Sequence, residues 1–251
     1  MSLQQSASTS APRFEPASVQ AVVFDIGGVF LYPQYAAVVA RLGELGLPAP
    51  TELDAFRRAH HAGVWALTDA RINASGGVDE QSQVFWGVYD RAYSAELGVE
   101  DHADDLADAI RSTWSWPHKG NIDAFHALAA DGWPVAIVSN NNGTAADQMV
   151  QHGVCQVGPG PLPTVPVIVD SAIEGVAKPD PAIFDPAIEA LGLDPGTLLY
   201  IGDTVHADVD GATNAGLQVV QLDPFDHHAM FEHPRRATVA DIAAELAAAR
   251  R

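Results

Sequence analysis

The stretch VVFDIGGVF, residues 22–30, places an acidic side chain at the end of an apolar run. Counting Ala21, four apolar residues precede Asp25, which is typical of a short buried strand. Gly27 and Gly28 follow almost at once, before the chain becomes apolar again. Glycine allows backbone conformations and close approaches that a side chain forbids, so we expect this turn to carry function.

The composition of the 251 residues limits the function classes. A hydrophobic content of 47% allows one large α/β domain, or a core with a small second domain. The formal charge of −19 argues against binding to nucleic acid or to an anionic membrane, because both would repel the chain. An anionic ligand would therefore need local positive charge, and the chain has only two lysines, Lys119 and Lys178. The single cysteine, Cys155, excludes an internal disulfide and suits a reducing compartment.

The first 18 residues are rich in Ser, Ala, Gln and Pro, and they lack the basic and then apolar pattern of a signal peptide. We expect residues 1–18 to form a disordered tail. No apolar run in the sequence approaches the roughly 20 residues that a membrane span needs. We therefore expect a cytoplasmic protein.

The order of predicted elements indicates two units. Residues 32–116 contain four helix-like segments and no strand-like run, whereas helices and strands alternate from residue 117 to the end. Such alternation predicts an α/β fold with a Rossmann-like parallel sheet and helices on both faces. The strand before Asp25 must belong to that sheet. We therefore expect a core of residues 19–31 and 117–251, and an inserted all-helical cap of residues 32–116.

Polar residues follow three predicted strands, and the carboxyl ends of parallel strands meet at the edge of a sheet where ligands bind. These residues are Asp25, the pair Ser139 and Asn140, and Asp203. A single acid at a strand end is commonly a turn former or helix cap, but three such ends together favour a site.

Two further residues join this predicted edge. Lys178 precedes two prolines in KPDPAIF, which hold it at the entrance of a helix. Asp208 follows Asp203 by five residues in GDTVHAD. Two carboxylates this close repel each other unless a cation or a lysine lies between them. A small set of hard oxygen ligands favours Mg²⁺ over zinc.

Read in order, the segments FDIGGV, VSN, KPDP and GDTVHAD resemble the four motifs of the haloacid dehalogenase-like hydrolase superfamily. The helical insertion after the first motif resembles the helical-cap branch of that superfamily. The resemblance covers nearly the whole chain after residue 18. It implies a Rossmann-like core, a mobile cap and, usually, Mg²⁺-dependent phosphoryl transfer to water from a small phosphorylated substrate.

Roles for individual residues follow from this resemblance. Asp25 is the expected nucleophile and forms an aspartyl-phosphate, while Ser139 and Lys178 bind the phosphoryl oxygens. The resemblance implies a Mg²⁺ ion held by Asp25, the carbonyl of Gly27 and Asp203, with Asp208 in support. Gly28 lets the backbone approach the phosphate, and the backbone N–H groups after Asp25 are expected to complete the phosphate site. Asn140 is included among the substrate-binding candidates, although we expect it to brace the loop.

Gly27 departs from the family pattern, because most phosphatases of this superfamily have a second Asp at this position that protonates the leaving group. General acid–base help is typically worth about 10²–10⁴ in rate. Without this Asp, three outcomes are expected. The enzyme is slow on alkyl phosphates, or it uses aryl, acyl or anomeric phosphates, whose leaving groups need no acid. In the third, a residue of the cap supplies the proton. His60 and His61 are the candidates for the last option, but paired histidines on a helix are mostly surface residues.

Two alternatives stay open at this stage. A 2-haloacid dehalogenase shares the fold and the nucleophile but needs no metal, and the intact pair Asp203 and Asp208 argues against it. The second alternative is a non-catalytic member of the superfamily that binds a phosphorylated ligand or a protein. Only Gly27 supports this hypothesis. A phosphonate hydrolase of the superfamily needs a cap lysine, and residues 32–116 contain none.

Overall fold

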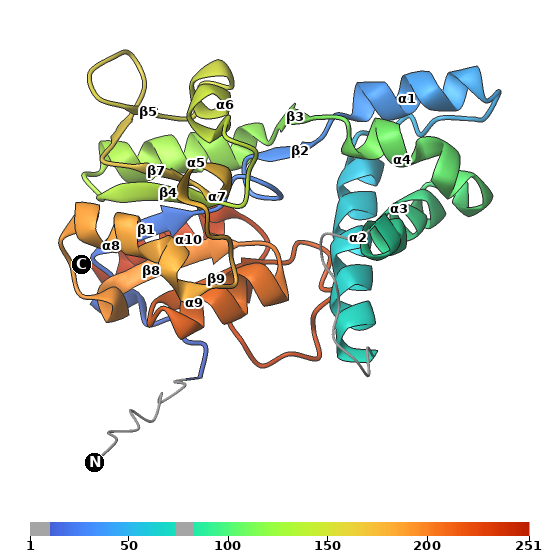
Figure 1. Cartoon of the computed structure of the whole chain (residues 1–251). Helices are drawn as coiled ribbons and strands as arrows, with labels where there is room; N and C mark the ends of the chain where they lie inside the picture. The colour runs from blue at the N-terminus through green and yellow to red at the C-terminus, as the bar shows by residue number, and fades with distance from the viewer. Residues whose placement is uncertain (1–10, 74–82, 251) are drawn as a thin grey trace.

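The computed structural model describes residues 11–73 and 83–250. These residues form an α/β core and a separate group of helices beside it (Figure 1). Residues 1–10 of the predicted tail, and residues 80–82 of the third predicted helix, lie outside the described residues.

A six-stranded parallel sheet forms the centre of the core, as predicted from the alternating elements. Its order is β10-β9-β8-β1-β4-β7, so the first strand lies in the middle of the sheet. The strands are β1 (Ala21–Phe24), β4 (Val135–Ser139), β7 (Ile168–Asp170), β8 (Leu198–Gly202), β9 (Gln218–Leu222) and β10 (Arg235–Arg236). A two-stranded ladder of β5 (Gln156–Val157) and β6 (Thr164–Val165) lies apart from this sheet.

Helices cover both faces of the sheet (Figure 1). Successive side chains of a strand point to opposite faces, so Val22 and Phe24 enter one apolar cluster while Ala21 and Val23 enter the other. The first cluster is covered by α5 (Lys119–Ala130), α6 (Ala145–Gln151) and α10 (Val239–Ala249). The second is covered by the 3-10 helix η3 (Pro181–Phe184), α8 (Asp185–Leu191), the π-helical segment η5 (Val205–Asp210) and α9 (Gly211–Asn214). Short helices η4 (Pro195–Thr197) and α7 (Ser171–Glu174) complete the core.

Between β2 (Leu31–Pro33) and β3 (Trp114–Pro117), the chain forms a group of helices that we call the helical unit. It consists of α1 (Tyr35–Glu44), α2 (Asp54–Asn73), α3 (Gln83–Glu96), η2 (Glu100–His102) and α4 (Ala103–Arg111). The unit has its own apolar cluster, which includes Leu42, Phe56 and Tyr93. Strands β2 and β3 pair antiparallel and carry the chain out of the core and back. Strand β3 therefore lies where the sequence shows no strand-like run, at the end of the predicted insertion.

The amino-terminal segment differs from the prediction of a tail over residues 1–18. Residues 16–18 form the 3-10 helix η1 (Pro16–Ser18), and Phe14 packs against the core. The carbonyl of Arg13 accepts a hydrogen bond of 2.9 Å from the N–H of Val219 in β9. This segment is ordered because an apolar ring and backbone hydrogen bonds attach it to the sheet.

No helix within residues 11–73 and 83–250 is long and apolar enough to cross a membrane. Cys155 is buried in the core as a free thiol, and burial raises its pKa to about 12. This cysteine therefore packs as an apolar residue.

Candidate active site

The three predicted strand ends meet at one edge of the sheet. Asp25 follows β1, Ser139 ends β4, and Asp203 follows β8, and β4 and β8 are the two neighbours of β1. All three side chains are buried. The strand order thus brings these residues together by the rule that predicted them.

Lys178 lies between two carboxylates. Its Nζ is 3.0 Å from Asp25 Oδ1 and 2.7 Å from Asp208 Oδ1. It also donates a hydrogen bond of 2.8 Å to the hydroxyl of Tyr200. The Lys178 side chain is 1% exposed, so water screens its charge little and the charge acts directly on its partners.

The electrostatics of these groups follow from burial and pairing. Burial raises the pKa of Asp25 to about 7; Lys178 acts against this shift, and the other carboxylates add to it. Burial would also raise the pKa of Asp208, but Lys178 and hydrogen bonds from Thr204 outweigh it and hold that pKa low. Burial lowers the pKa of Lys178, yet Asp208 and Asp25 reverse the effect and raise it. Lys178 is therefore charged, and its stronger partner is Asp208.

Asp208 is fully engaged with the protein. Its Oδ2 accepts hydrogen bonds from the N–H of Asp203 at 3.1 Å and from the N–H and hydroxyl of Thr204 at 2.8 and 2.7 Å. Its Oδ1 accepts from Lys178 and from Tyr200. These bonds fix the turn after β8, so Asp208 positions Asp203 and Lys178, in line with the supporting role expected for it.

Asn140 braces Lys178 through the backbone. Its Nδ2 donates to the carbonyl of Lys178 at 3.0 Å, and its Oδ1 accepts from the N–H of Lys178 at 2.8 Å. Both ends of the amide are thus engaged with the loop that carries the lysine. This geometry fits the bracing interpretation, and the inclusion of Asn140 among the substrate-binding residues stays a prediction.

Gly28 lies in contact with a metal candidate. Its φ is +64°, and a Cβ built there would lie 2.1 Å from Asp203 Oδ2. Glycine is therefore needed both for the backbone conformation and for the approach of Asp203. The N–H of Gly28 donates to the carbonyl of Leu31 at 2.9 Å. This bond engages the Gly28 N–H in the turn into β2, and the role of Gly28 in substrate binding stays a prediction.

Gly27 faces an aromatic ring. A Cβ at this position would lie 3.1 Å from Cζ3 and 3.2 Å from Cε3 of Trp114, which belongs to β3. The place that an acidic side chain occupies in most phosphatases of the resembled superfamily is therefore adjacent to an indole. The role of the Gly27 carbonyl as a metal ligand stays a prediction.

Three buried carboxylates surround the predicted metal position. Asp25, Asp203 and Asp208 offer oxygen atoms that lie within 4.8 Å of one another. Asp25 Oδ1 makes no aligned hydrogen bond within the part of the chain that the structure describes, although Lys178 lies beside it. Since the Lys178 ammonium contacts only two of these three carboxylates, the set fits a hard divalent cation such as Mg²⁺, and Asp25 and Asp203 are the carboxylates left to bind it.

A sequence profile for haloacid dehalogenase-like hydrolases matches residues 19–216. The chain belongs to the haloacid dehalogenase-like hydrolase family. This match spans the strand ends and motifs described above and confirms the resemblance found in the sequence.

Relatives within the family include two reaction types. The chain is 30% identical over 210 residues to a phosphoglycolate phosphatase of Pseudomonas putida, covering 80% of this chain and 68% of that protein. It is 25% identical over 215 residues to (S)-2-haloacid dehalogenase 4A of Burkholderia cepacia, covering 82% and 83%. A match to Acyl-CoA dehydrogenase family member 10 of Mus musculus, at 23% identity, covers 82% of this chain but 18% of that protein.

A solved structure confirms the fold. A magnesium-bound HAD hydrolase from Bacillus subtilis, whose structure reveals interdomain movement, aligns with a TM-score of 0.58. It is 19% identical and covers 91% of this chain and 98% of that one. The comparisons therefore establish a hydrolase of this family, with phosphatases and dehalogenases among its relatives.

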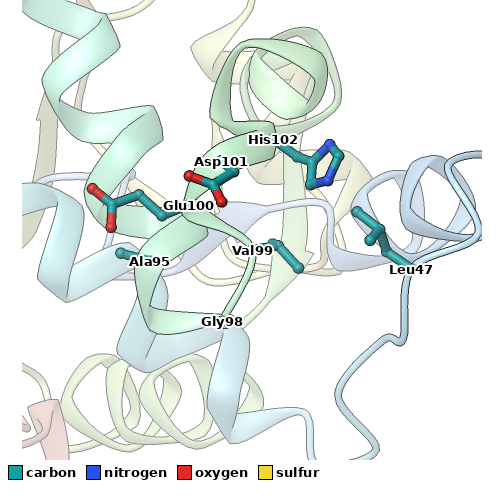
Figure 2. A pocket seen from close by; sticks show the side chains of 7 residues that line it. All are labelled: Leu47, Ala95, Gly98, Val99, Glu100, Asp101 and His102. Atoms are coloured by element: carbon teal, nitrogen blue, oxygen red, sulfur yellow. The ribbon is translucent and has the colours of Figure 1, made fainter.

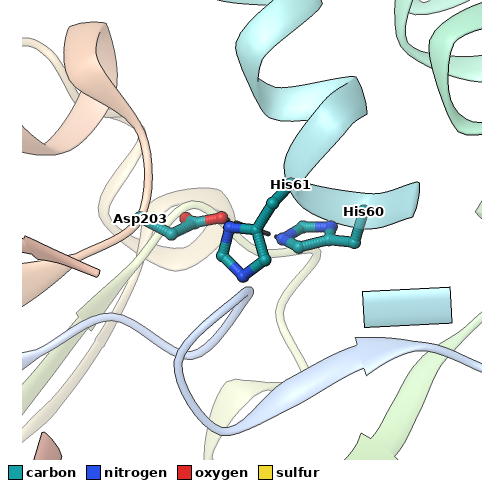
Figure 3. Close-up of side chains that lie close together, drawn as sticks. All are labelled: His60, His61 and Asp203. Atoms are coloured by element: carbon teal, nitrogen blue, oxygen red, sulfur yellow. Dashed lines mark hydrogen bonds and ion pairs between the residues drawn. The ribbon is translucent and has the colours of Figure 1, made fainter. Parts of the chain in front are cut away.

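Two histidines of α2 complete the surroundings of this haloacid dehalogenase-like site (Figure 3). His60 Nε2 lies 2.9 Å from Asp203 Oδ2, and His60 Nδ1 lies 2.8 Å from the hydroxyl of Tyr89. His61 Nε2 lies 3.2 Å from the hydroxyl of Tyr32. Burial lowers the pKa of His61. The expectation that this histidine pair lies on the surface is wrong, because the helical unit presses that part of α2 onto the core.

A second contact between the helical unit and the core involves the segment after β9. Thr68 Oγ1 lies 3.2 Å from His228 Nε2, and both residues are buried. His233 is buried as well, with its Nε2 2.6 Å from Gln221 Oε1. These histidines follow no metal-ligand spacing in the sequence, and they serve as packing and hydrogen-bonding residues.

An open hollow of about 460 Å³ lies at the outer part of the helical unit (Figure 2). It is lined by Leu47, Ala95, Gly98, Val99, Glu100, Asp101 and His102. None of these residues belongs to the site around Asp25. The acid residues of the site are instead covered, since Asp25 is 8% exposed and Asp203 is 3% exposed.

Proposed function

We propose that this chain is a Mg²⁺-dependent phosphatase that hydrolyses small phosphomonoesters through an aspartyl-phosphate on Asp25. The observation that carries the proposal is the ion-pair arrangement at the sheet edge. Lys178 bridges Asp25 and Asp208, and Asp25, Asp203 and Asp208 lie within metal-binding reach of one another. A phosphate dianion requires positive charge, which Lys178 and a cation bound by these carboxylates would supply, whereas a haloacid does not require the carboxylate set.

The residues would divide the reaction between them. The carboxylate of Asp25 attacks phosphorus, and the bond from phosphorus to the leaving oxygen breaks. Lys178 and the hydroxyl of Ser139 bind the phosphoryl oxygens, and Asp25 and Asp203 hold the metal. A bound Mg²⁺ supplies charge that offsets the repulsion between the carboxylate and the phosphate. Water then attacks phosphorus, the bond from phosphorus to the Asp25 oxygen breaks, and inorganic phosphate is released as one proton of the water passes to solvent.

The leaving group must accept a proton, and Gly27 has no side chain to supply one. Substrates whose leaving group is stable as an anion are therefore favoured. These are aryl, acyl and anomeric phosphates, since their leaving groups need less help from a general acid. Compact phosphorylated metabolites of this kind are the proposed substrate class.

The helical unit would act as a cap. With Asp25, Asp203 and Lys178 all buried, a substrate reaches the site only when α2 moves away from the core. Strands β2 and β3 are the connections about which such a movement would occur. Trp114 lies on the second of these strands, and its ring contacts both Gly27 and His60. The surroundings of the indole would therefore change when α2 moves away from the core.

Dehalogenation of a 2-haloacid is the second candidate. The relative from Burkholderia cepacia aligns over 82% of this chain, and the ring of Trp114 makes the surroundings of Gly27 apolar. The buried Asp203 has no evident task in a metal-free reaction, which makes this candidate the weaker one.

Phosphate release from p-nitrophenyl phosphate, with and without Mg²⁺, tests the proposal. Release should require Mg²⁺ and should be lost in Asp25→Asn, whereas Asp123→Asn, a surface carboxylate paired with Lys119, should retain it. Chloride release from 2-chloropropionate without added metal, and no phosphate release, would instead support the dehalogenase. Binding of phosphate esters without turnover would identify a non-catalytic relative.

A further inference from the structure

A second group of possible metal ligands lies where the helical unit meets the core. His60 and His61 come from α2, and Asp203 follows β8. The three side chains are buried, and each offers a ligand atom within 4.8 Å of the other two. Figure 3 shows the two imidazole rings converging on the carboxylate.

Each histidine has one ring nitrogen held by a tyrosine. His60 Nδ1 lies 2.8 Å from the Tyr89 hydroxyl, which leaves Nε2 toward Asp203. His61 Nε2 lies 3.2 Å from the Tyr32 hydroxyl, so Nδ1 is the ring nitrogen that would bind the metal. Metal-binding histidines almost always have their second nitrogen fixed in this way, since the contact sets the tautomer and the ring orientation.

The donor types distinguish this group from the carboxylate set around Lys178. Two imidazoles and one carboxylate suit Zn²⁺ and neighbouring transition metals, whereas Mg²⁺ prefers oxygen ligands. Ligand atoms about 2.0–2.1 Å from a Zn²⁺ ion lie roughly 3–4 Å from one another. His60 Nε2 and Asp203 Oδ2 are 2.9 Å apart, and no pair of ligand atoms is more than 4.8 Å apart, so small side-chain adjustments would meet that geometry. The two sets share only Asp203.

We propose that His60, His61 and Asp203 form a binding site for a divalent transition-metal ion such as Zn²⁺. The ion would join α2 to the core, because its ligands come from both. Since Asp203 belongs to both sets, Zn²⁺ bound here would exclude Mg²⁺ and keep Asp25 covered, and would inhibit phosphate release. That inhibition rests on the proposed function, whereas the binding does not.

The test uses the full-length protein freed of metal. Co²⁺ is titrated while its visible d–d absorption is recorded, and Zn²⁺ binding is measured by calorimetry. The site predicts one ion per chain, with the Co²⁺ spectrum of imidazole coordination. His61→Ala should weaken Zn²⁺ binding by about tenfold or more, and Tyr32→Phe, which removes a single hydroxyl, by about tenfold.

Two further variants separate this site from others. Asp25→Asn should keep the Co²⁺ spectrum, because Asp25 lies outside the histidine set. His102→Ala, at a partly exposed histidine beside Asp105, should leave binding unchanged. The proposal is overturned if His61→Ala and Tyr32→Phe bind Zn²⁺ as the wild type does, or if Asp25→Asn abolishes the Co²⁺ spectrum. Neither outcome depends on turnover, so failure of this proposal is distinct from failure of the proposed phosphatase.

Discussion

The indole of Trp114 lies against Gly27, so closely that a Cβ at residue 27 would be 3.1 Å from Cζ3 of the ring. The two residues come from opposite ends of the helical insertion, Gly27 before it and Trp114 on the returning strand β3. A side chain at residue 27 would require the ring to shift by a few tenths of an ångström. The indole of Trp114 therefore occupies the space into which a side chain at residue 27 would project.

This pairing predicts non-additive effects of Gly27→Asp and Trp114→Ala. Gly27→Asp alone should destabilise the protein by about 1–3 kcal/mol, since it overfills the contact. Gly27→Asp should reduce the free energy of unfolding by less in the Trp114→Ala protein, where there is room for the carboxylate. Urea unfolding of the four proteins in the double-mutant cycle measures the coupling. Additive free energies would show that the ring does not restrict residue 27.

The double variant also tests the missing proton donor. If leaving-group protonation limits the rate, Gly27→Asp in the Trp114→Ala background should speed hydrolysis of alkyl phosphates more than of p-nitrophenyl phosphate. The comparison is made on kcat/KM with both substrates. Equal acceleration of both would mean that protonation is not the slow step.

Gly28→Ala should be far more damaging than Gly132→Ala. Both glycines have positive φ, +64° and +79°, but a Cβ at Gly132 meets no atom within 4 Å. Gly132→Ala should cost about 1 kcal/mol for the backbone alone. Gly28→Ala should cost at least about 2 kcal/mol more, because the methyl group displaces Asp203. Urea unfolding gives both values, and equal costs would refute the close approach of Asp203.

Lys178→Met should be strongly destabilising, because it leaves Asp25 and Asp208 buried without their common cation. The loss expected for a broken buried pair is about 3–5 kcal/mol. Lys119→Met is the matched control: Lys119 is 86% exposed, and its change should lie within about 0.5 kcal/mol. Chemical denaturation compares the two. Similar stabilities of the two variants would mean that Lys178 does not neutralise the site.

Asp25 should make the stability of the metal-free protein fall as pH rises. Its pKa is raised to about 7 in the folded protein, so between about pH 4 and 7 the unfolded chain loses this proton while the folded chain keeps it. Asp25→Asn removes that penalty. Its stability relative to the wild type should grow by on the order of 2 kcal/mol from pH 5 to 8.

Urea unfolding in the presence of a chelator measures this difference at each pH. At pH 8, added Mg²⁺ should reduce the stability difference between Asp25→Asn and the wild type, because the ion binds the folded wild-type protein and stabilises that protein. A difference that stays constant across this pH range would show that Asp25 ionises normally.

Much of this site follows from the sequence for a simple reason. Asp25, Ser139 and Asp203 were found by the rule that ligands bind at the carboxyl ends of parallel strands, and sheet order alone makes them neighbours. Lys178 is predicted at the site because the two prolines that follow it fix the loop at the entrance of a helix. These inferences depend on local pattern and topology, which a single sequence carries.

The contacts between the helical unit and the core could not be predicted in this way. Adjacent helical positions point in different directions, so His60 and His61 gave no sign that both would reach Asp203. The ring of Trp114 over Gly27 depends on how β3 returns to the core. The hydrogen bond that occupies the N–H of Gly28 depends on where β2 begins. Each of these contacts joins segments whose relative placement no local pattern fixes.

The central claim is that Asp25 carries the phosphoryl group, and rapid acid quenching followed by peptide mass spectrometry tests it most directly. The wild-type protein is mixed with Mg²⁺ and p-nitrophenyl phosphate, quenched during turnover and digested. The account predicts the mass of one phosphoryl group on the peptide that contains Asp25, and none in Asp25→Asn. A phosphoryl group on another residue, or phosphate release by Asp25→Asn at the wild-type rate, would contradict it.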